Sequence, residues 1–557
     1  MGGSIALCYL IALMATSRLV GITRDETYRI DRARDATGWF RELSKLDAQE
    51  NAATVWSRPY MNRFWNERVT ARPTIMQPIM GISHMLLNPI LGGLHEMLEY
   101  RLPTMVLSAL LAYLVFLIGA DLGGILAGAA SALVFCLLPR VFFDAHLACL
   151  DAAVTSFAVL GLFGLTRAVT RKEKRWIAIA VAGIGLTVAT KNSLPLVAPP
   201  VALILLYFLF RGMPQRVVNT YLWLIPGVAV IFLLSWPPFL VNPRYNILFY
   251  ITCYLDTPHH PWMYVGSAIG QPPFPMAFPF VYTAATTPVP FLVLALVGVG
   301  IVAFDLAKRR SDHLSIERAL VIGMAFLPIL IIAHPRIHHY GGTKHWMLST
   351  PYMAVLAGTA LVRVIRHAGE FWKSRRLRLA ITTLAAALVF LPGVLGTAST
   401  APWGHTYYNG LWGWNGLEAR MQAQYWGDST NAILPWLNAN LPRGARVFLH
   451  RTEPRAPRIY QTMRLMRPDL KWTVNISEAE WHLFHYKQTF YRDLIAISFF
   501  RHEVPYYTIT TWDGAPMVSI FGPAKAQPVM NEPGEQPEAL QDEDHAADSN
   551  GTPAKEP

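Results

Sequence analysis

Long apolar runs, separated by short polar connections, recur along the chain as far as residue 397. A helix needs about 20 apolar residues to cross the hydrocarbon core of a bilayer, so runs of this kind predict membrane-spanning helices. The pattern therefore predicts a mainly α, polytopic membrane protein with about eleven transmembrane helices. The predicted spans cover residues 4–20, 101–119, 122–138, 151–168, 176–190, 194–210, 219–237, 286–305, 317–334, 347–365 and 379–397.

The first apolar run is short enough to be compared with a cleaved signal peptide. Such a peptide begins with a positively charged region in front of its apolar part. No Lys or Arg precedes the run at 4–20. We therefore expect this run to be retained as a helix.

Basic residues gather in alternate connections, and this alternation predicts the topology. Lys and Arg accumulate in the cytoplasmic connections of membrane proteins. The basic clusters lie at 167–175, 211–216, 308–310 and 363–378. With these clusters in the cytoplasm, the N-terminus is cytoplasmic and the C-terminal part is extracytoplasmic. The extracytoplasmic side then also receives the long connections 21–100, 139–150, 238–285 and 335–346.

Two of these long connections differ in composition. Connection 21–100 mixes charged residues with Trp56, Tyr60 and Phe64, a combination typical of helices that lie on a membrane surface. Connection 238–285 is rich in proline and aromatic residues. Because proline inside a helix removes a hydrogen bond and clashes with the preceding turn, we expect little regular helix there.

The chain changes character after residue 398, where short periodic segments replace the long apolar runs. We expect a transmembrane catalytic domain over 1–398 and a small α/β extracytoplasmic domain over 399–525. The latter should hold a helix at 431–438, a strand at 446–450 and a hairpin that turns at Asp513-Gly514. Residues 526–557 are acidic and poor in large apolar side chains, which predicts a disordered tail.

The overall charge does not indicate a nucleic-acid partner. The formal net charge is +12, but the positive residues lie in short clusters between apolar runs, where they orient helices. The four cysteines are too few for a disulfide framework. Cys149 and Cys253 both fall on the predicted extracytoplasmic side, so a single bridge between them is compatible with the sequence.

Asp25 and Glu26 follow the first span directly. A carboxylate beside an apolar wall can act as a general base that accepts the proton of a hydroxyl group. Carboxylates at membrane depth are costly and are often functional. The alternative is that both residues are solvated charges beyond the end of a helix.

The segment from Arg140 to Asp151 also contains Asp144 and His146. If the segment is helical, Arg140, Asp144 and Asp151 share one face and could form a polar pocket. The alternative is an interfacial pair between Arg140 and Asp144, with Asp151 capping the next helix.

Two further segments are rich in hydrogen-bond donors. Lys191 interrupts two apolar runs and is either a phosphate contact or a lysine that extends to the membrane interface. The loop 334–345 contains several histidines, but their spacing matches no helical metal-binding pair. We expect this loop to bind an anion, with contacts from Arg336, His339, Tyr340, Lys344 and His345.

The order of these motifs resembles bacterial glycosyltransferase family 39 and its relatives, which have the GT-C membrane fold and include protein O-mannosyltransferases and lipid A aminoarabinose transferases. The resemblance covers about residues 1–525. It rests on Thr23-Arg24-Asp25-Glu26, on Arg140, His146 and Asp151, on Thr190-Lys191, on His260-Pro261-Trp262-Met263-Tyr264, on His339 through His345, and on Tyr425-Trp426-Gly427-Asp428.

The resemblance implies a polyprenyl-phosphate sugar donor and an acceptor on the extracytoplasmic side of a bacterial inner membrane. It assigns Asp25 as the catalytic base, Asp151 as a second acidic residue and Lys191 as a donor-phosphate contact. No cofactor or metal ligand follows from it, and a divalent cation is left open. The chain departs from the family at Arg72-Pro73-Thr74, where relatives often carry a His-Pro-Pro motif.

Together these features favour an inverting hexosyl- or pentosyltransferase that acts on a lipid, glycan or protein acceptor. Catalysis is assigned to Asp25, Glu26 and Asp151, and the donor phosphate to Arg140, Lys191, Arg336, Lys344 and His345. Further substrate contacts are expected from Asp144, His146, His260, Tyr264, His339 and Tyr340. The alternatives are a transporter or flippase for a lipid-linked sugar, which would show internal repeats, and a non-catalytic partner in polysaccharide assembly.

Overall fold

The computed structural model describes most of the chain. The described residues are 1–45, 52–65, 74–91, 96–171, 173–191, 193–255, 260–308, 314–337, 341–371, 374–412, 421–422, 424–450, 452, 455–486, 498–499 and 501–523. The tail 526–557, His339, Tyr340 and the segment Arg72-Pro73 lie outside the described residues.

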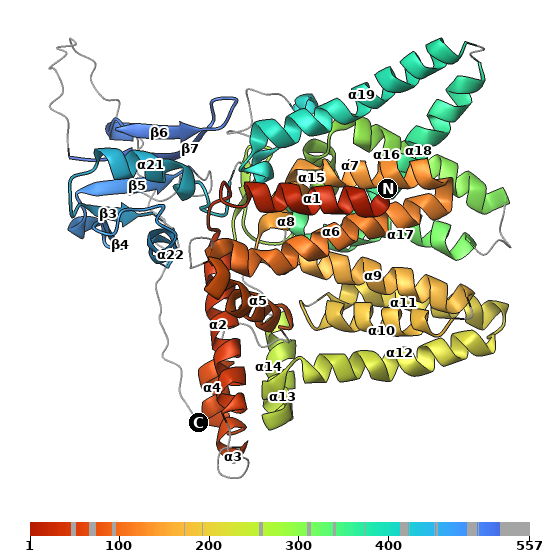
Figure 1. Ribbon diagram of the computed structural model, residues 1–557, viewed down its shortest axis with the longest axis horizontal. Coiled ribbons are helices and arrows are strands. Elements are labelled where there is room, and N and C mark those ends of the chain that lie inside the picture. The colour runs from red at the N-terminus through yellow and green to blue at the C-terminus, as the bar shows by residue number, and fades with distance from the viewer. Residues whose placement is uncertain are drawn as a thin grey trace.

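Helices form the larger part of the molecule, and they run side by side as a bundle (Figure 1). Among the described residues, seven are long and apolar enough to cross a membrane. These are α6 (Glu96–Gly123), α9 (Asp151–Thr170), α11 (Leu194–Arg211), α12 (Gln215–Leu234), α16 (Val289–Lys308), α17 (Ser315–Ile332) and α19 (Arg375–Thr400). The chain is therefore a multi-pass membrane protein.

The predicted count of eleven spans is not confirmed. Helices α7 (Ile125–Cys136) and α8 (Pro139–His146) meet at a 70° bend and can be counted as one broken span, which raises the total to eight. Helices α1 (Gly2–Thr16) and α10 (Arg175–Val188) are apolar but shorter, and α18 (Ser349–Glu370) is less apolar.

The basic clusters fall between α9 and α10, α11 and α12, α16 and α17, and α18 and α19. The described ends of these helices that flank the clusters lie at the end of the bundle away from the β-sheet (Figure 1). Connections with and without basic clusters alternate along the sequence, and they correspond to the two opposite ends of the bundle. That the basic end faces the cytoplasm stays a prediction from the positive-inside rule.

The connection after the first span folds into α2 (Arg24–Ser44), α3 (Ala52–Val55), α4 (Arg58–Phe64) and α5 (Met76–Leu91). Helices α2 and α4 run across the end of the bundle, transverse to the spans (Figure 1). This direction is the one expected of helices on a membrane surface, and their place in the interface stays a prediction.

The proline-rich connection is more regular than predicted. It contains α13 (Pro237–Val241), α14 (Pro243–Leu255), strands β1 (Trp262–Tyr264) and β2 (Ser267–Ile269), and α15 (Phe278–Thr286). Several prolines occupy the first turn of these helices. A proline there loses no intrahelical hydrogen bond, so it starts a helix instead of breaking one.

A five-stranded sheet lies beyond the end of the bundle, next to α2 (Figure 1). Its strand order is β4-β3-β5-β7-β6, with β3 parallel to both neighbours and β7 antiparallel to both. The described elements of this part are α21 (Thr430–Asn440), β3 (Arg446–Leu449), α22 (Ala456–Thr462), β4 (Lys471–Thr473), β5 (Trp481–His485), β6 (Tyr507–Thr510) and β7 (Pro516–Phe521). Short 3-10 helices among the described residues are η1 (Gly342–His345), η2 (Gly404–Thr406), η3 (Gly410–Trp412) and η4 (Ile476–Glu478).

The fold class is thus confirmed as mainly α, with a small α/β region near the C-terminus. The helix, the strand and the hairpin predicted after residue 398 are present as α21, β3 and the β6–β7 pair. The boundary between domains at residue 398 stays a prediction.

The sheet region and the bundle share one apolar core. Ile22 and Ile30 from the N-terminal part pack in the same buried cluster as Leu434 and Tyr460. The Tyr460 hydroxyl also accepts a hydrogen bond from the Ile22 backbone N–H at 2.8 Å. The C-terminal region is therefore held against the start of α2, and the space between them is where charged residues collect.

Candidate functional site

A cavity of about 600 Å³ opens between the end of the bundle and the C-terminal region. Segments from seven separate parts of the sequence contribute to its wall. The lining residues are Arg24, Asp25, Tyr28, Arg29, Cys149, Leu150, Asp151, Lys191, His260, Pro261, Trp262, Gly341, Lys344, His345, Tyr425, Trp426 and Arg455. Six of the residues predicted from the sequence meet here: Asp25, Asp151, Lys191, His260, Lys344 and His345.

Asp25 lies in the first turn of α2, at one wall of the cavity. The Thr23 side chain accepts a hydrogen bond from the Glu26 backbone, and the Glu26 side chain accepts one from the Thr23 backbone, which together cap the helix. The Asp25 side chain is 43% exposed. The backbone at Asp25 is therefore held in the first turn of the helix, and its carboxylate is open to a ligand.

Lys344 lies opposite Asp25, with its Nζ atom 3.6 Å from the Asp25 Oδ2 atom. The ammonium group also lies 4.2 Å above the centre of the Trp426 ring, which attracts a cation through its negative face. Gly341 permits this placement, because a Cβ atom at that position would come within 2.1 Å of Lys344 Cε. Gly341 also has a φ of +83°, a conformation that glycine adopts readily.

A second oppositely charged pair borders the same cavity. Lys191 Nζ donates to Asp151 Oδ1 at 2.5 Å, and the two side chains are 26% and 12% exposed. Lys191 follows the end of α10, and Asp151 begins α9. Each of the two lysines of the cavity therefore has a carboxylate beside it, Asp151 for Lys191 and Asp25 for Lys344.

Glu26 lies behind the cavity wall and not on it. Its side chain is fully buried and forms a two-pronged ion pair with Arg101, with Nε–Oε1 and Nη2–Oε2 distances of 2.7 and 2.9 Å. It also accepts hydrogen bonds from the backbone N–H groups of Ala148 and Thr23. A carboxylate whose lone pairs are all engaged is poorly placed to take a proton, so this geometry supports a positioning role for Glu26.

The stretch from Arg140 to Asp151 does not form one helix, because it breaks between His146 and Asp151. The predicted common face is therefore wrong. Arg140 is buried and donates to the Tyr407 carbonyl and the Tyr282 hydroxyl.

His146 is also buried, and it bonds Thr16 of α1 at 2.8 Å through Nε2. Neither Arg140 nor His146 lines the cavity, and the same holds for the buried Asp144.

Some of the remaining residues predicted to contact substrate line the cavity, and others do not. His260 lines the cavity, whereas Tyr264 lies on β1 and packs edge-on against Phe278. Arg336 is exposed and is not among the lining residues. Cys149 lines the cavity as a free cysteine, and the side chain of Cys253 lies outside the described part of the chain.

Sequence reasoning missed a buried pair that lies near Glu26. The Asp428 Oδ1 atom is 3.8 Å from the His405 Nε2 atom, and both side chains are buried. At this distance His405 forms no hydrogen bond with Asp428, and no other described residue donates one to the carboxylate. Burial raises the Asp428 pKa to about 7, with a further increase from Glu26 and an opposing effect of Arg101.

Arg101 was also missed. The sequence signal for Arg101 was a charged residue at the start of an apolar run, whereas Asp428 ended the motif Tyr425-Trp426-Gly427-Asp428 and was given no role. In the described part of the chain, no group of three or more His, Cys, Asp or Glu side chains is arranged to hold a metal ion.

Comparisons with known proteins agree with this architecture. Residues 83–240 match the family model described as dolichyl-phosphate-mannose-protein mannosyltransferase; this segment is less than half of the chain and includes Asp151 and Lys191. A comparison with curated proteins gives no match.

Two solved structures share the fold. ArnT from Cupriavidus metallidurans in the apo state has a TM-score of 0.50 at 12% identity, over 93% of this chain and 97% of that one. The apo oligosaccharyltransferase from Archaeoglobus fulgidus has a TM-score of 0.50 at 11% identity, over 83% of this chain and 64% of that one. The expected resemblance to GT-C membrane glycosyltransferases is thereby confirmed.

Proposed function

We propose that this protein is an inverting glycosyltransferase that moves a sugar from a polyprenyl-phosphate donor to an acceptor hydroxyl. The family that matches residues 83–240 is described by a dolichyl-phosphate-mannose donor, which belongs to this chemical class. The observation that carries the proposal is the 3.6 Å approach of Asp25 to Lys344 in one cavity. The pair puts a proton acceptor next to a cation.

Asp25 is the proposed general base. In an inverting transfer, the acceptor oxygen attacks the anomeric carbon on the face opposite the lipid phosphate, and the bond to the phosphate oxygen breaks. The acceptor proton passes to a carboxylate within hydrogen-bond reach. Asp25 suits this role because its carboxylate is more exposed than that of Asp151, and because its contact with Lys344, at 3.6 Å, is looser than the 2.5 Å bond between Asp151 and Lys191.

Lys344, Lys191 and His345 are the proposed contacts of the departing phosphate. The leaving group gains negative charge as its bond to the sugar breaks, so nearby fixed cations lower the barrier. All three residues line the cavity. Since Lys191 already binds Asp151 at 2.5 Å, we expect the phosphate to share this ammonium group with the carboxylate.

The proposed location of the chemistry is the extracytoplasmic side. The cavity lies at the end of the bundle next to the sheet, opposite the connections that carry basic clusters (Figure 1). By the positive-inside rule the basic end is cytoplasmic. The donor phosphate would then enter from the outer leaflet, and the C-terminal region would border the path of the acceptor.

Turnover of a labelled donor tests the proposal. Purified protein is incubated with a radiolabelled polyprenyl-phosphate sugar and with a membrane extract from the native cells as the source of acceptor. The expected result is release of free polyprenyl phosphate and transfer of label to a new product with inverted anomeric configuration. Movement of the intact donor across vesicles without its cleavage would instead establish a transporter.

A further inference from the structure

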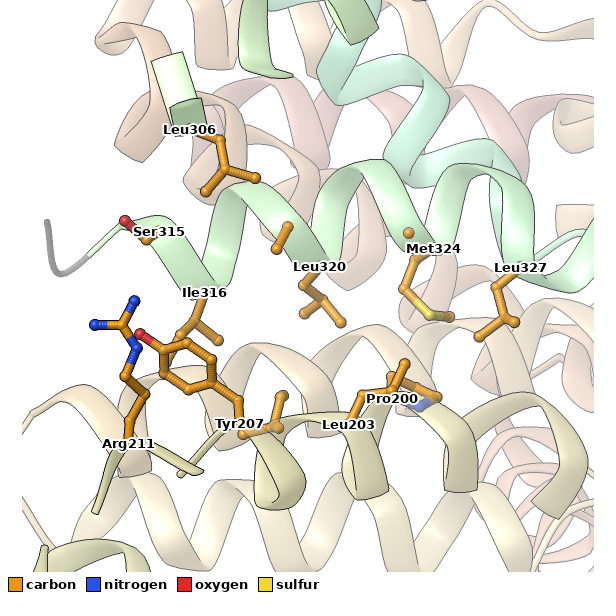
Figure 2. A pocket seen from close by; sticks show the side chains of 13 residues that line it. Pro200, Leu203, Tyr207, Arg211, Leu306, Ser315, Ile316, Leu320, Met324 and Leu327 are labelled. Atoms are coloured by element: carbon orange, nitrogen blue, oxygen red, sulfur yellow. The ribbon is translucent and has the colours of Figure 1, made fainter. Parts of the chain in front are cut away.

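A separate groove of about 510 Å³ runs between α11 and α17, within the membrane-spanning part of the molecule (Figure 2). It shares no lining residue with the charged cavity. Its walls are mainly apolar, and they consist of Pro200, Leu203, Ile204, Tyr207, Arg211, Leu306, Ser315, Ile316, Ala319, Leu320, Gly323, Met324 and Leu327.

The polar atoms of the groove gather at one of its ends. Figure 2 shows the Arg211 guanidinium, the Tyr207 ring and the Ser315 hydroxyl together, whereas Leu327 and Pro200 lie at the opposite end. The Arg211 guanidinium lies 5.9 Å from the centre of the Tyr207 ring. Among the described residues no carboxylate pairs with Arg211, and its guanidinium gives this end of the groove a positive charge.

The length of the groove matches half of a bilayer. From Pro200 to Arg211, α11 rises by about 16 Å at 1.5 Å per residue. A single leaflet contributes about half of the roughly 30 Å hydrocarbon core. The groove can therefore hold one hydrocarbon chain of a leaflet along its length, with the polar end at the depth of the headgroups.

The position of Arg211 distinguishes this groove from the site of the proposed donor. Helix α11 begins at Leu194, just after Lys191 of the charged cavity, and ends at Arg211. The helix places the two ends about 26 Å apart along its axis. A lipid whose phosphate meets Arg211 thus belongs to the leaflet opposite the charged cavity.

We infer that the α11–α17 groove binds an anionic phospholipid, with one acyl chain between the two helices and the headgroup phosphate against Arg211. Three observations support this choice: an apolar wall, a length of one leaflet, and a lone guanidinium at the end. An arginine guanidinium forms strong charge-assisted hydrogen bonds with phosphate oxygens. An anionic phospholipid has no net positive headgroup charge to offset its phosphate, so its net negative charge is also attracted to the basic connection from Arg211 to Arg216.

Gly323 offers a direct way to fill the groove. A Cβ atom at Gly323 would meet nothing within 4 Å, so Gly323→Leu places a side chain in open space that the acyl chain would occupy. The substitution also favours the helix, since glycine is a poor helix former. The matched control is Gly3→Leu on α1, where a Cβ atom also meets nothing within 4 Å and which does not line the groove.

Native mass spectrometry of the full-length protein in detergent gives the readout, with phosphatidylglycerol and phosphatidylcholine as probes. We expect the wild type and Gly3→Leu to retain phosphatidylglycerol in preference to phosphatidylcholine. Gly323→Leu should lose most of the bound phosphatidylglycerol. Arg211→Gln should reduce the preference about tenfold, because it removes one charge-assisted contact.

Two results would overturn the inference. One is equal retention of phosphatidylglycerol by Gly323→Leu and the wild type. The other is displacement of phosphatidylglycerol by polyprenyl phosphate from the wild type, since this would show that the groove accepts the donor lipid. Size-exclusion chromatography of each variant shows that the fold is intact. Both results are independent of glycosyl transfer and so do not depend on the proposed function.

Discussion

Arg101 and Glu26 form an ion pair in which neither side chain is exposed to solvent. Arg101 also donates hydrogen bonds to the backbone carbonyls of Ser17, Val20 and Gly21. Through Glu26 the same pair reaches the backbone N–H of Ala148, which precedes Asp151 in the chain. A single buried pair thus joins the segments that carry both acidic residues of the cavity.

Loss of this pair should destabilise the whole protein. Removing one partner of a buried ion pair leaves an uncompensated charge and costs about 3–5 kcal/mol. We expect Arg101→Met to lower the thermal unfolding temperature in detergent sharply, and Glu26→Gln to lower it as well. The double variant Arg101→Met with Glu26→Leu should recover part of the loss. Single variants as stable as the wild type would contradict this role.

The bond between Lys191 and Asp151 leads to a prediction on donor binding. Lys191→Ala should weaken polyprenyl-phosphate binding by about 10- to 150-fold, since a charge-assisted hydrogen bond contributes about 1.5–3 kcal/mol. The substitution also leaves the Asp151 carboxylate to repel the phosphate. Adding Asp151→Asn to Lys191→Ala should therefore restore part of the affinity, as measured by titration of the purified protein.

Two controls accompany this titration. Lys191→Arg should retain only part of the affinity, because the planar guanidinium does not replace a compact ammonium group. Arg336→Ala should bind like the wild type, because Arg336 is exposed and does not line the cavity. A strong loss in Arg336→Ala with none in Lys191→Ala would place the phosphate elsewhere.

Asp428 predicts a pH dependence of stability. Its pKa is about 7 in the folded protein, above the ordinary value of 3.8, because the carboxyl group is buried. The folded state therefore favours the protonated form of Asp428. The contribution of this preference to the free energy of unfolding is complete below pH 3.8 and is lost as the pH rises through 7. Across this window the free energy of unfolding changes by up to about 1.4 kcal/mol per pH unit.

The comparison of Asp428→Asn with the wild type isolates this effect. The neutral amide cannot ionise, so the variant should gain stability relative to the wild type as the pH rises from 4 to 8. His405 contributes with the opposite sign, since burial lowers its pKa well below 6.5, but it is present in both proteins. A constant difference in unfolding temperature across the pH range would count against a buried, titrating Asp428.

The sequence predicted the helical architecture well, because an apolar run long enough to span a bilayer has few other stable forms. It predicted the span count less well, since α1 and α10 are shorter than their apolar runs and the run at 122–138 ends at a bend. The hairpin at Asp513-Gly514 followed from turn chemistry alone. The proline-rich connection was misread because proline both breaks a helix and starts one.

The candidate site was predicted only as a set of residues. Asp25 and Glu26 are adjacent in sequence, but successive side chains of a helix point in different directions, so one meets the cavity and the other meets Arg101. The partner of Glu26 lies 75 positions away, and no local pattern identifies it. The bonds of Lys191 with Asp151 and of Lys344 with Asp25 likewise depend on tertiary packing.

The most direct test of the account is the transfer rate of Asp25→Asn, measured as release of polyprenyl phosphate from a labelled donor at saturating concentration. The amide keeps the shape of the side chain and cannot accept the acceptor proton. The account predicts a loss of about 10²–10⁴-fold in rate, with donor affinity unchanged. The matched control Glu42→Gln, on the same helix and away from the cavity, should transfer at the wild-type rate. Turnover by Asp25→Asn near the wild-type rate would contradict the account.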